Sequence, residues 1–288
     1  MLRVATRGSA LARWQAEHVA ALLGGAELVI VETAGDRDTS TSLSELGGQG
    51  VFVKEVQAAV LDGRADLAVH SAKDLPSNAA LQPPGLVIGA VPERADARDA
   101  LVGSALAAIA PGGTVATGSA RRRALLADLR PDLTFADLRG NIATRLDKAA
   151  GFAAIVVAAA ALDRLGLGDR AAELLSTDVL VPQVGQGALA IECRTGEEEA
   201  VAALDHRPSR RAVDAERAWL AAIGGGCDLP AGAHAVVDGD EVRLTAVLAS
   251  FDGRIVLRDT VTGTDPAAIG TDLATAMLEQ GGRWLLAG

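Results

Sequence analysis

The sequence is poor in aromatic residues and carries an excess of negative charge. Its 288 residues include four Phe, three Trp and no Tyr, and the net charge is −10. Single-stranded nucleic acid is usually gripped by stacking its bases on aromatic side chains, and few are available here. The negative charge also argues against nonspecific attraction to nucleic acid or to anionic membranes. We therefore expect no nucleic-acid partner and no membrane partner.

Long hydrophobic runs and a cysteine framework are missing as well. No stretch reaches the roughly 18 apolar residues of a membrane-spanning helix, and residues 1–6 predict a strand, without the hydrophobic core of a signal peptide. The two cysteines lie in unlike settings and do not suggest a disulfide. We expect a soluble cytoplasmic protein whose cores are built from Ala, Val, Leu and Ile.

Strands and helices alternate along the first two thirds of the chain. The expected helices are 9–23, 52–61, 119–129 and 141–149, and the expected strands are 28–33, 66–70, 86–91, 114–116 and 154–158. Ser9 is the predicted cap of the first helix. Residues 35–50 are rich in Gly, Ser, Thr and Asp and predict a long mobile loop. This alternation predicts two α/β domains with mainly parallel sheets.

The last third of the chain has a different pattern. It predicts a helix at 209–222, a hairpin of two strands at 241–249 and 254–261, and a terminal helix after Pro266. This is the pattern of a small α+β domain. We predict three domains, formed by residues 1–93 with 188–205, by 94–183 and by 208–288.

Cys227 lies in a sequence setting that would leave its thiol open to reaction. Gly224, Gly225 and Gly226 remove side-chain bulk before it, and Pro230 stops regular structure soon after. Its thiol is therefore predicted to lie on a pliable, open loop, where it can carry a group covalently. Cys193 instead ends a largely apolar strand and is interpreted as a small buried thiol.

Three segments with arginine lie where helices are expected to begin, at 6–9, 117–123 and 138–145. A helix N-terminus offers free N–H groups, and arginine adds a planar fork for carboxylate or phosphate. Any one of these segments could be an ordinary charged helix face, but three together favour a ligand with several anionic groups. Because successive helical residues point about 100° apart, at most two of Arg121, Arg122 and Arg123 can reach it.

The segment from His70 to Pro76 follows a predicted strand, where open α/β sheets bind ligands. Lys73 and Asp74 place an ammonium beside a carboxylate that could steady a cation and shuttle protons. A turn aspartate before proline is an equally good interpretation of Asp74 from spacing alone. His70 is interpreted as a packed histidine at a strand end, and no metal-ligand spacing is present.

Two glycine-rich segments lack the spacing of nucleotide sites. Residues 47–50 miss the Lys-Ser/Thr ending of a P-loop and are interpreted as a lid or turn. Residues 184–187 predict a close backbone approach, such as a hinge between domains.

Together these segments resemble the porphobilinogen deaminase (hydroxymethylbilane synthase) family of tetrapyrrole biosynthesis, and their order spans most of the chain. The matching stretches are TRGSALA at 6–12, GGQGVFVKE at 47–55, HSAKDLP at 70–76, GSARR at 118–122, LRGNIATR at 138–145, PQVGQG at 182–187 and GGC at 225–227. The resemblance implies two lobes like those of periplasmic-type binding proteins, between which the chain crosses twice, and a third domain with Cys227. It also implies a monomer.

The resemblance further implies a dipyrromethane cofactor bound to Cys227 through a thioether, on which four porphobilinogen units are joined with loss of ammonia. Asp74 would be the catalytic carboxylate. Every pyrrole carries an acetate and a propionate, so the chain is a polyanion. The residues implied at the cofactor are Lys73, Thr117, Ser119, Arg121, Arg122 and Gln186, and those implied at the substrate are Arg7, Ser9, Arg139, Asn141, Arg145 and Arg164.

The sequence departs from the family pattern at three positions. Gln49 stands where many members have Lys, Glu45 where a basic residue is frequent, and Ala72 where a larger apolar residue is usual. The main alternative is a two-lobed binding protein for a small organic polyanion, without catalysis. An inactive paralogue is a second alternative, and a third is a thiol-nucleophile enzyme that uses Cys227 with a base such as His234.

Overall fold

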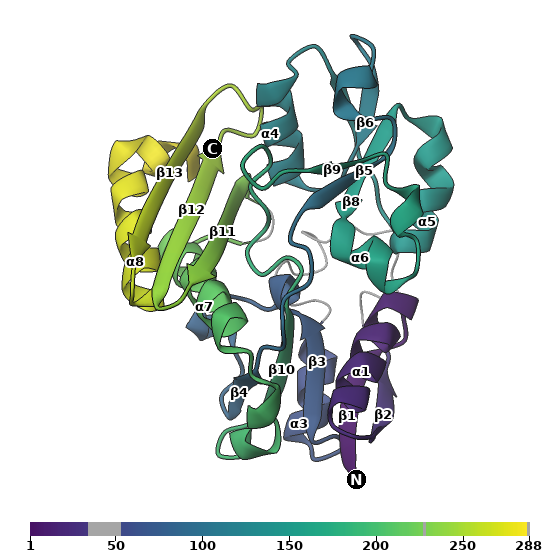
Figure 1. Ribbon diagram of the computed structural model, residues 1–288, viewed down its shortest axis with the longest axis vertical. Helices are drawn as coiled ribbons and strands as arrows, with labels where there is room; N and C mark the ends of the chain where they lie inside the picture. Colours follow the sequence, from purple (N-terminus) through teal and green to yellow (C-terminus); the bar gives the residue numbers. More distant parts are fainter. Residues whose placement is uncertain (34–52, 227–228, 287–288) are drawn as a thin grey trace.

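The structure is a computed structural model that describes residues 1–33, 53–226 and 229–286. Three sheets form three parts of the molecule, with the first sheet at the bottom of Figure 1, the second at the upper right and the third at the left. The predicted loop at 35–50, with Glu45 and Gln49, and the predicted cofactor residue Cys227 lie outside the described residues.

The first part is a five-stranded sheet in the order β2-β1-β3-β10-β4, with helices on both faces. Its elements are β1 (Leu2–Arg7), α1 (Ala10–Leu22), β2 (Ala26–Val31), α3 (Lys54–Leu61), β3 (Leu67–Ser71), β4 (Leu86–Ala90) and β10 (Leu189–Arg194). Neighbouring strand residues point to opposite faces, so Val4 packs in the cluster of α1 and Ala5 in that of α3. Cys193 is fully buried in the α1 cluster, as predicted.

The second part repeats this plan in the order β7-β6-β8-β5-β9. Its elements are β5 (Asp99–Gly103), β6 (Thr114–Ala116), α4 (Ala120–Leu129), β7 (Thr134–Ala136), α5 (Ile142–Lys148), β8 (Ala154–Ala158), α6 (Ala159–Arg164) and β9 (Glu173–Leu175). The predicted strands 114–116 and 154–158 are found with the same bounds.

Four of the five strands in each sheet run in one direction, as expected for mainly parallel sheets, and one strand runs against the other four. The opposing strands are β10 and β5. Each is the first strand after the chain has crossed from the other part, so it starts at the edge where its neighbours end. As a consequence, the carboxyl ends of β1, β3, β6, β7 and β8 all face the segments that cross between the two parts.

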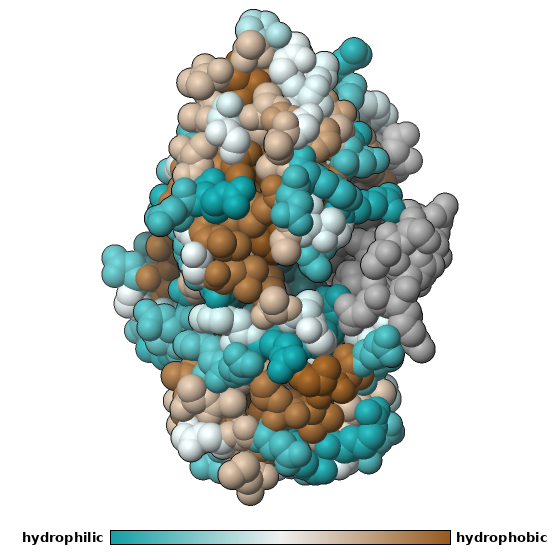
Figure 2. Space-filling view, turned by 90° about the vertical axis from the view of Figure 1, so that its right-hand side faces the viewer, coloured by the Kyte–Doolittle hydropathy of each residue, from teal (hydrophilic) through white to brown (hydrophobic). Residues whose placement is uncertain are grey.

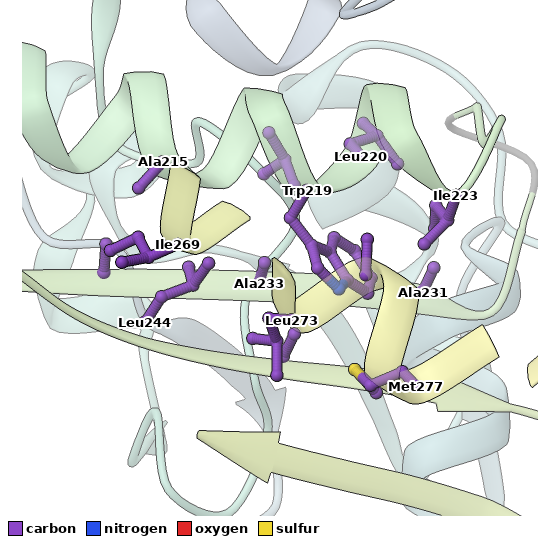
Figure 3. Packing of buried hydrophobic residues seen from close by; sticks show 14 of the residues in the cluster. Ala215, Trp219, Leu220, Ile223, Ala231, Ala233, Leu244, Ile269, Leu273 and Met277 are labelled. Atoms are coloured by element: carbon purple, nitrogen blue, oxygen red, sulfur yellow. The ribbon is translucent and has the colours of Figure 1, made fainter. Parts of the chain in front are cut away.

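The third part is a three-stranded antiparallel sheet, β11-β12-β13, covered by helices. Its elements are α7 (Arg207–Ala222), β11 (Ala231–Asp238), β12 (Glu241–Ala249), β13 (Val256–Gly263), α8 (Pro266–Met277) and α9 (Arg283–Leu286). Figure 3 shows Trp219 of α7 pointing between the sheet and α8, toward Leu273 and Met277, and its side chain is fully buried. Burying a tryptophan removes a large apolar surface from water, so this side chain anchors the domain.

Two details of the third part differ from expectation. Strand β11 was not predicted, and β13 begins at Val256, two residues later than expected. The turn between β12 and β13 is longer because Ser250 bonds to Ile255 through both its backbone and its hydroxyl group.

On the side seen in Figure 2, which is the right-hand side of Figure 1, the described residues form no continuous apolar face. Hydrophobic residues form separate patches there, divided by hydrophilic bands. Among the described residues, no helix is both long and apolar enough to cross a membrane.

Candidate active site

The segments that cross between the first two parts, 91–98 and 176–188, lie side by side. The backbone N–H of Ala95 donates to the carbonyl of Gly187 at 3.2 Å. Gly185 has a φ of 72°, and a Cβ added to it would lie 2.9 Å from the backbone nitrogen of Lys73. Only glycine lets the second crossing segment pack this closely on the turn with Lys73 and Asp74. The predicted close backbone approach at 184–187 is therefore present.

One pocket opens where β1 and β3 end. Its wall consists of Arg7, Ser9, Leu11, Ala12, Gln15, Val53, Val69, His70, Ser71 and Asp74. Ser9 caps α1, as predicted, since its Oγ accepts from the N–H of Ala12 at 3.3 Å. A guanidinium, a helix N-terminus and the Asp74 carboxylate thus share one pocket. This combination can hold an anionic ligand beside a group that transfers protons.

Lys73 follows the same strand but reaches toward the second part. Its Nζ lies 3.4 Å from Oε1 of Gln186. Burial and repulsion by Arg122 lower the pKa of Lys73 to about 8, although Asp74 and Asp99 oppose the shift. Since burial disfavours the charged form of this lysine, a bound anion would favour it.

Arg121 and Arg122, at the start of α4, turn inward and share the carboxylate of Asp99. Nη2 of Arg121 lies 2.8 Å from Oδ2, and Nη2 of Arg122 lies 2.7 Å from Oδ1. Burial alone would raise the pKa of Asp99, but the attraction of the two guanidinium groups holds it well below its usual range. Because one carboxylate faces two guanidinium groups, the cluster keeps an excess positive charge.

Gln186 links this cluster to the crossing segments. Its side chain is fully buried, and its Nε2 donates to Oδ1 of Asp99 at 2.9 Å and to the carbonyl of Ala97 at 2.8 Å. Arg123 instead lies near the surface and pairs with the exposed Asp137 at 2.7 Å. Two of the three consecutive arginines therefore face inward and one faces solvent.

A second pocket lies between the second and third parts, beside the residue that precedes Cys227. It is lined by Ser119, Arg121, Gln183, Val184, Leu220, Gly226, Leu229 and Ala231. Arg121 is 2% exposed, and its buried Nε has no hydrogen-bond partner. An unpaired buried N–H is costly, so Arg121 favours an anionic partner at this position.

The other predicted ligand residues of the second part lie around its helix starts. The hydroxyl of Thr117 accepts from the N–H of Ser119 at 3.2 Å, and Asn141 caps α5 by accepting from Thr144 at 3.0 Å. Arg139 is exposed. Burial and repulsion by Arg122 lower the pKa of Arg145 to about 10, which places Arg145 in the same positive field.

Arg164 is bound elsewhere than in the cluster around Asp99. Its Nη2 donates to the carbonyl of Gly187 at 2.7 Å, and its guanidinium carbon lies 5.8 Å from the ring centre of Trp14. It therefore spans from α6 to α1, across the two parts. Burial lowers its pKa to about 10.

Two family models match the chain. The model described as porphobilinogen deaminase, dipyromethane cofactor binding domain, matches residues 2–202, and the model of the porphobilinogen deaminase C-terminal domain matches residues 211–279. The chain belongs to the porphobilinogen deaminase family. The porphobilinogen deaminase of Roseiflexus sp. (strain RS-1) is 47% identical to it over all of this chain and 99% of its own length. That of Acidothermus cellulolyticus is 45% identical over 99% and 91%.

Solved structures with a similar backbone include an ABC transporter from Parabacteroides distasonis. It is 12% identical and covers 70% of this chain and 69% of its own, with a TM-score of 0.41. Similarity at that level says nothing about function. The two family models and the full-length relatives, rather than this likeness, indicate porphobilinogen deaminase activity with a dipyrromethane cofactor.

Sequence reasoning missed two buried carboxylates that hold the site together. Asp99 opens the otherwise apolar strand β5, and Glu216 lies on the buried face of α7 beside Ala215 and Trp219. Glu216 pairs with Arg94 at 2.5 Å and accepts from the backbone N–H of Gly185 at 2.7 Å. An acidic residue at a core position was the available signal, since such residues are rarely buried without partners.

Proposed function

We propose that the protein joins four porphobilinogen units head to tail, with loss of ammonia, on a dipyrromethane primer attached to Cys227, and releases hydroxymethylbilane. The observation that carries this proposal is the excess positive charge of Arg121 and Arg122 over Asp99, close to Lys73 in the turn after β3 that also contains Asp74. Each pyrrole unit brings two carboxylates. A growing chain of such units needs cations, and it also needs a group that manages protons.

The residues beside Gly226 fit a covalently held polyanion. The unpaired Nε of Arg121 supports an anion there, in a pocket that Ser119 also lines. We assign the carboxylates of the cofactor to Arg121 and Ser119, together with Lys73, Thr117, Arg122 and Gln186 from the adjoining cluster. When bound, the dipyrromethane supplies a primer whose terminal pyrrole carbon is nucleophilic.

The pocket at the ends of β1 and β3 is assigned to the reacting substrate. Arg7 and Ser9 would hold its carboxylates there, and Arg139, Asn141, Arg145 and Arg164 would hold those of the growing chain. Asp74 would stabilise the positive charge that develops as ammonia leaves and would accept protons, which is the work that carboxylates do in such sites.

The mass of the purified protein tests the cofactor assignment. Protein made in a host that supplies porphobilinogen should exceed the mass of the bare polypeptide by one dipyrromethane, and Cys227→Ser should lose this excess. If the mass equals that of the bare polypeptide and Ehrlich's reagent gives no colour, the cofactor assignment is wrong. The alternative of a non-catalytic binding protein for an organic polyanion would then remain.

Turnover of porphobilinogen tests Asp74. Asp74→Asn should keep the cofactor mass but lose about 10²–10⁴-fold in kcat, the usual worth of acid–base catalysis. Asp137→Asn, which changes an exposed aspartate near α4, is the control. Near-normal turnover of Asp74→Asn would remove the residue from the catalytic role.

We also propose that the protein is a cytoplasmic monomer with domain limits at 1–93 with 188–205, 94–183 and 208–288. The divided hydrophobic patches of Figure 2 support the monomer on that face, because obligate interfaces are large and apolar. Sedimentation at micromolar concentration measures the oligomeric state.

A further inference from the structure

A histidine and a glutamate are buried together at the pocket that contains Asp74, and neither has a role in the function described so far. Nε2 of His70 lies 3.0 Å from Oε2 of Glu192, and the two side chains are 4% and 1% exposed. The residues come from the antiparallel strands β3 and β10. His70 pairs with Ala190, so Glu192, two residues further on, lies on the same face of the sheet.

Gln57 of α3 holds the carboxylate from the other side. Its buried Nε2 lies 3.0 Å from both carboxylate oxygens of Glu192. A ring nitrogen that carried a lone pair would repel a carboxylate oxygen at 3.0 Å, whereas an N–H is attracted to it. Of the two neutral tautomers, this contact favours the one protonated at Nε2, although the contact does not meet hydrogen-bond geometry.

This assignment fixes the chemistry of the other ring nitrogen. With the proton on Nε2, Nδ1 of the neutral ring is an acceptor. Since Nε2 is directed at Glu192, Nδ1 is the ring nitrogen available to the pocket that His70 lines together with Asp74. A histidine oriented by a buried carboxylate in this way is arranged as a general base.

We propose that His70, oriented by Glu192, accepts the proton released at each coupling step. This inference rests on the proposal that the pocket with Asp74 is the reaction site. In each coupling the C–N bond of the aminomethyl group breaks, and ammonia leaves with the electron pair. A C–C bond forms at the free carbon of the neighbouring pyrrole, whose C–H bond then returns its electrons to the ring. The remaining proton goes to Nδ1 of His70 and from there to water, while Glu192 stabilises the imidazolium.

Three variants test the proposal in the cofactor-loaded enzyme. His70→Gln should keep the dipyrromethane mass and lose about 10²–10³-fold in kcat, with little change in KM. Glu192→Gln should lose less in kcat, again with little change in KM. His18→Gln, an exposed histidine stacked on Trp14, is the control and should match the wild type. An unchanged kcat in His70→Gln would overturn the proposal.

A second measurement does not depend on activity or on the variant folding. Nitrogen-15 spectra of the histidine-labelled wild-type protein, with and without cofactor, should show the neutral form of His70 protonated at Nε2. Protonation at Nδ1 would overturn the proposal. Asp74→Asn distinguishes a failure of the pocket assignment from a failure of the role proposed for His70. If it turns over normally, the pocket assignment fails, whereas if it is slow and His70→Gln is normal, only the role of His70 fails.

Discussion

Replacing Asp99 by Asn tests whether the inward-facing arginines receive a polyanion. Asp99 accepts hydrogen bonds from Arg121, Arg122 and Gln186 in a fully buried site. Asn keeps the size of the side chain but removes its charge and turns one acceptor into a donor. Two buried guanidinium groups then lose their counter-charge.

The cost follows from the burial of the cluster. Removing one partner of a buried pair destabilises a protein by about 3–5 kcal/mol. Arg121 and Arg122 keep acceptors in the carbonyls of Val181 and Val156, at 2.7 and 3.1 Å, so we expect the lower end, about 3 kcal/mol, without cofactor. At about 2–4 °C per kcal/mol this is roughly a 6–12 °C fall in the apparent Tm. The carboxylates of bound dipyrromethane would replace part of the lost charge, so the fall should be about half as large with cofactor.

Thermal unfolding with and without cofactor measures the difference. Asp137→Asn is the matched control, because it removes the exposed partner of Arg123 on the same helix and should cost less than about 1 kcal/mol. The pKa of Asp99 is depressed in the folded state, so its stabilisation is present above the unfolded value near pH 4 and is lost only as pH falls toward the folded pKa. Mild acid should not mimic the variant. Equal losses with and without cofactor would refute the polyanion role of the arginines.

Two further predictions concern the turn with Lys73. Because the pKa of Lys73 is about 8, kcat/KM should fall as pH rises through 8 and the ammonium is lost. Lys73→Met should abolish this fall in kcat/KM, and Lys73→Arg should move it to higher pH. If the fall persists in Lys73→Met, Lys73 is not its source. Gly185→Ala should destabilise by about 1–3 kcal/mol through positive φ alone and by more through the clash with Lys73, and it should slow turnover. Gly166→Ala, at φ 68° with open space, isolates the φ effect in urea unfolding, so equal losses would show that the contact with Lys73 is unimportant.

The periodicity of the sequence located most of the longer elements of this fold, but not the direction of every strand. Alternation predicted α4 and α7 within about two residues of their observed starts. It could not predict that β5 and β10 run against their neighbours, because the path of the chain between domains decides this. The strands β7 and β9, of three residues each, were not predicted. The strand β11 is rich in alanine and contains Gly232, which weakens its strand signal.

The sequence predicted which types of residue form the candidate site, but not which of these residues pair with one another. Arginine at helix starts correctly indicated positive charge where strands end. The resemblance implied that Arg121 and Arg122 hold the cofactor, and the structure adds that both are bonded to Asp99, 22 and 23 residues earlier in the chain. Pairs so far apart in sequence are set by packing between β5 and α4, for which no local pattern exists.

The charge balance of the proposed site predicts that its grip weakens as the chain grows. Seven cations are proposed to hold the cofactor and the growing chain, and Asp99 already balances part of the charge of two of them; the seven are Arg7, Lys73, Arg121, Arg122, Arg139, Arg145 and Arg164. Two cofactor rings and four added rings bring about twelve carboxylates. The first additions should therefore be held mainly by these cations, and the last should be held mainly by solvent and counter-ions. Since salt screens exposed charges, raising ionic strength should slow the early additions more than the late ones in single-turnover mass measurements. Equal slowing at every addition would contradict a site that saturates in charge.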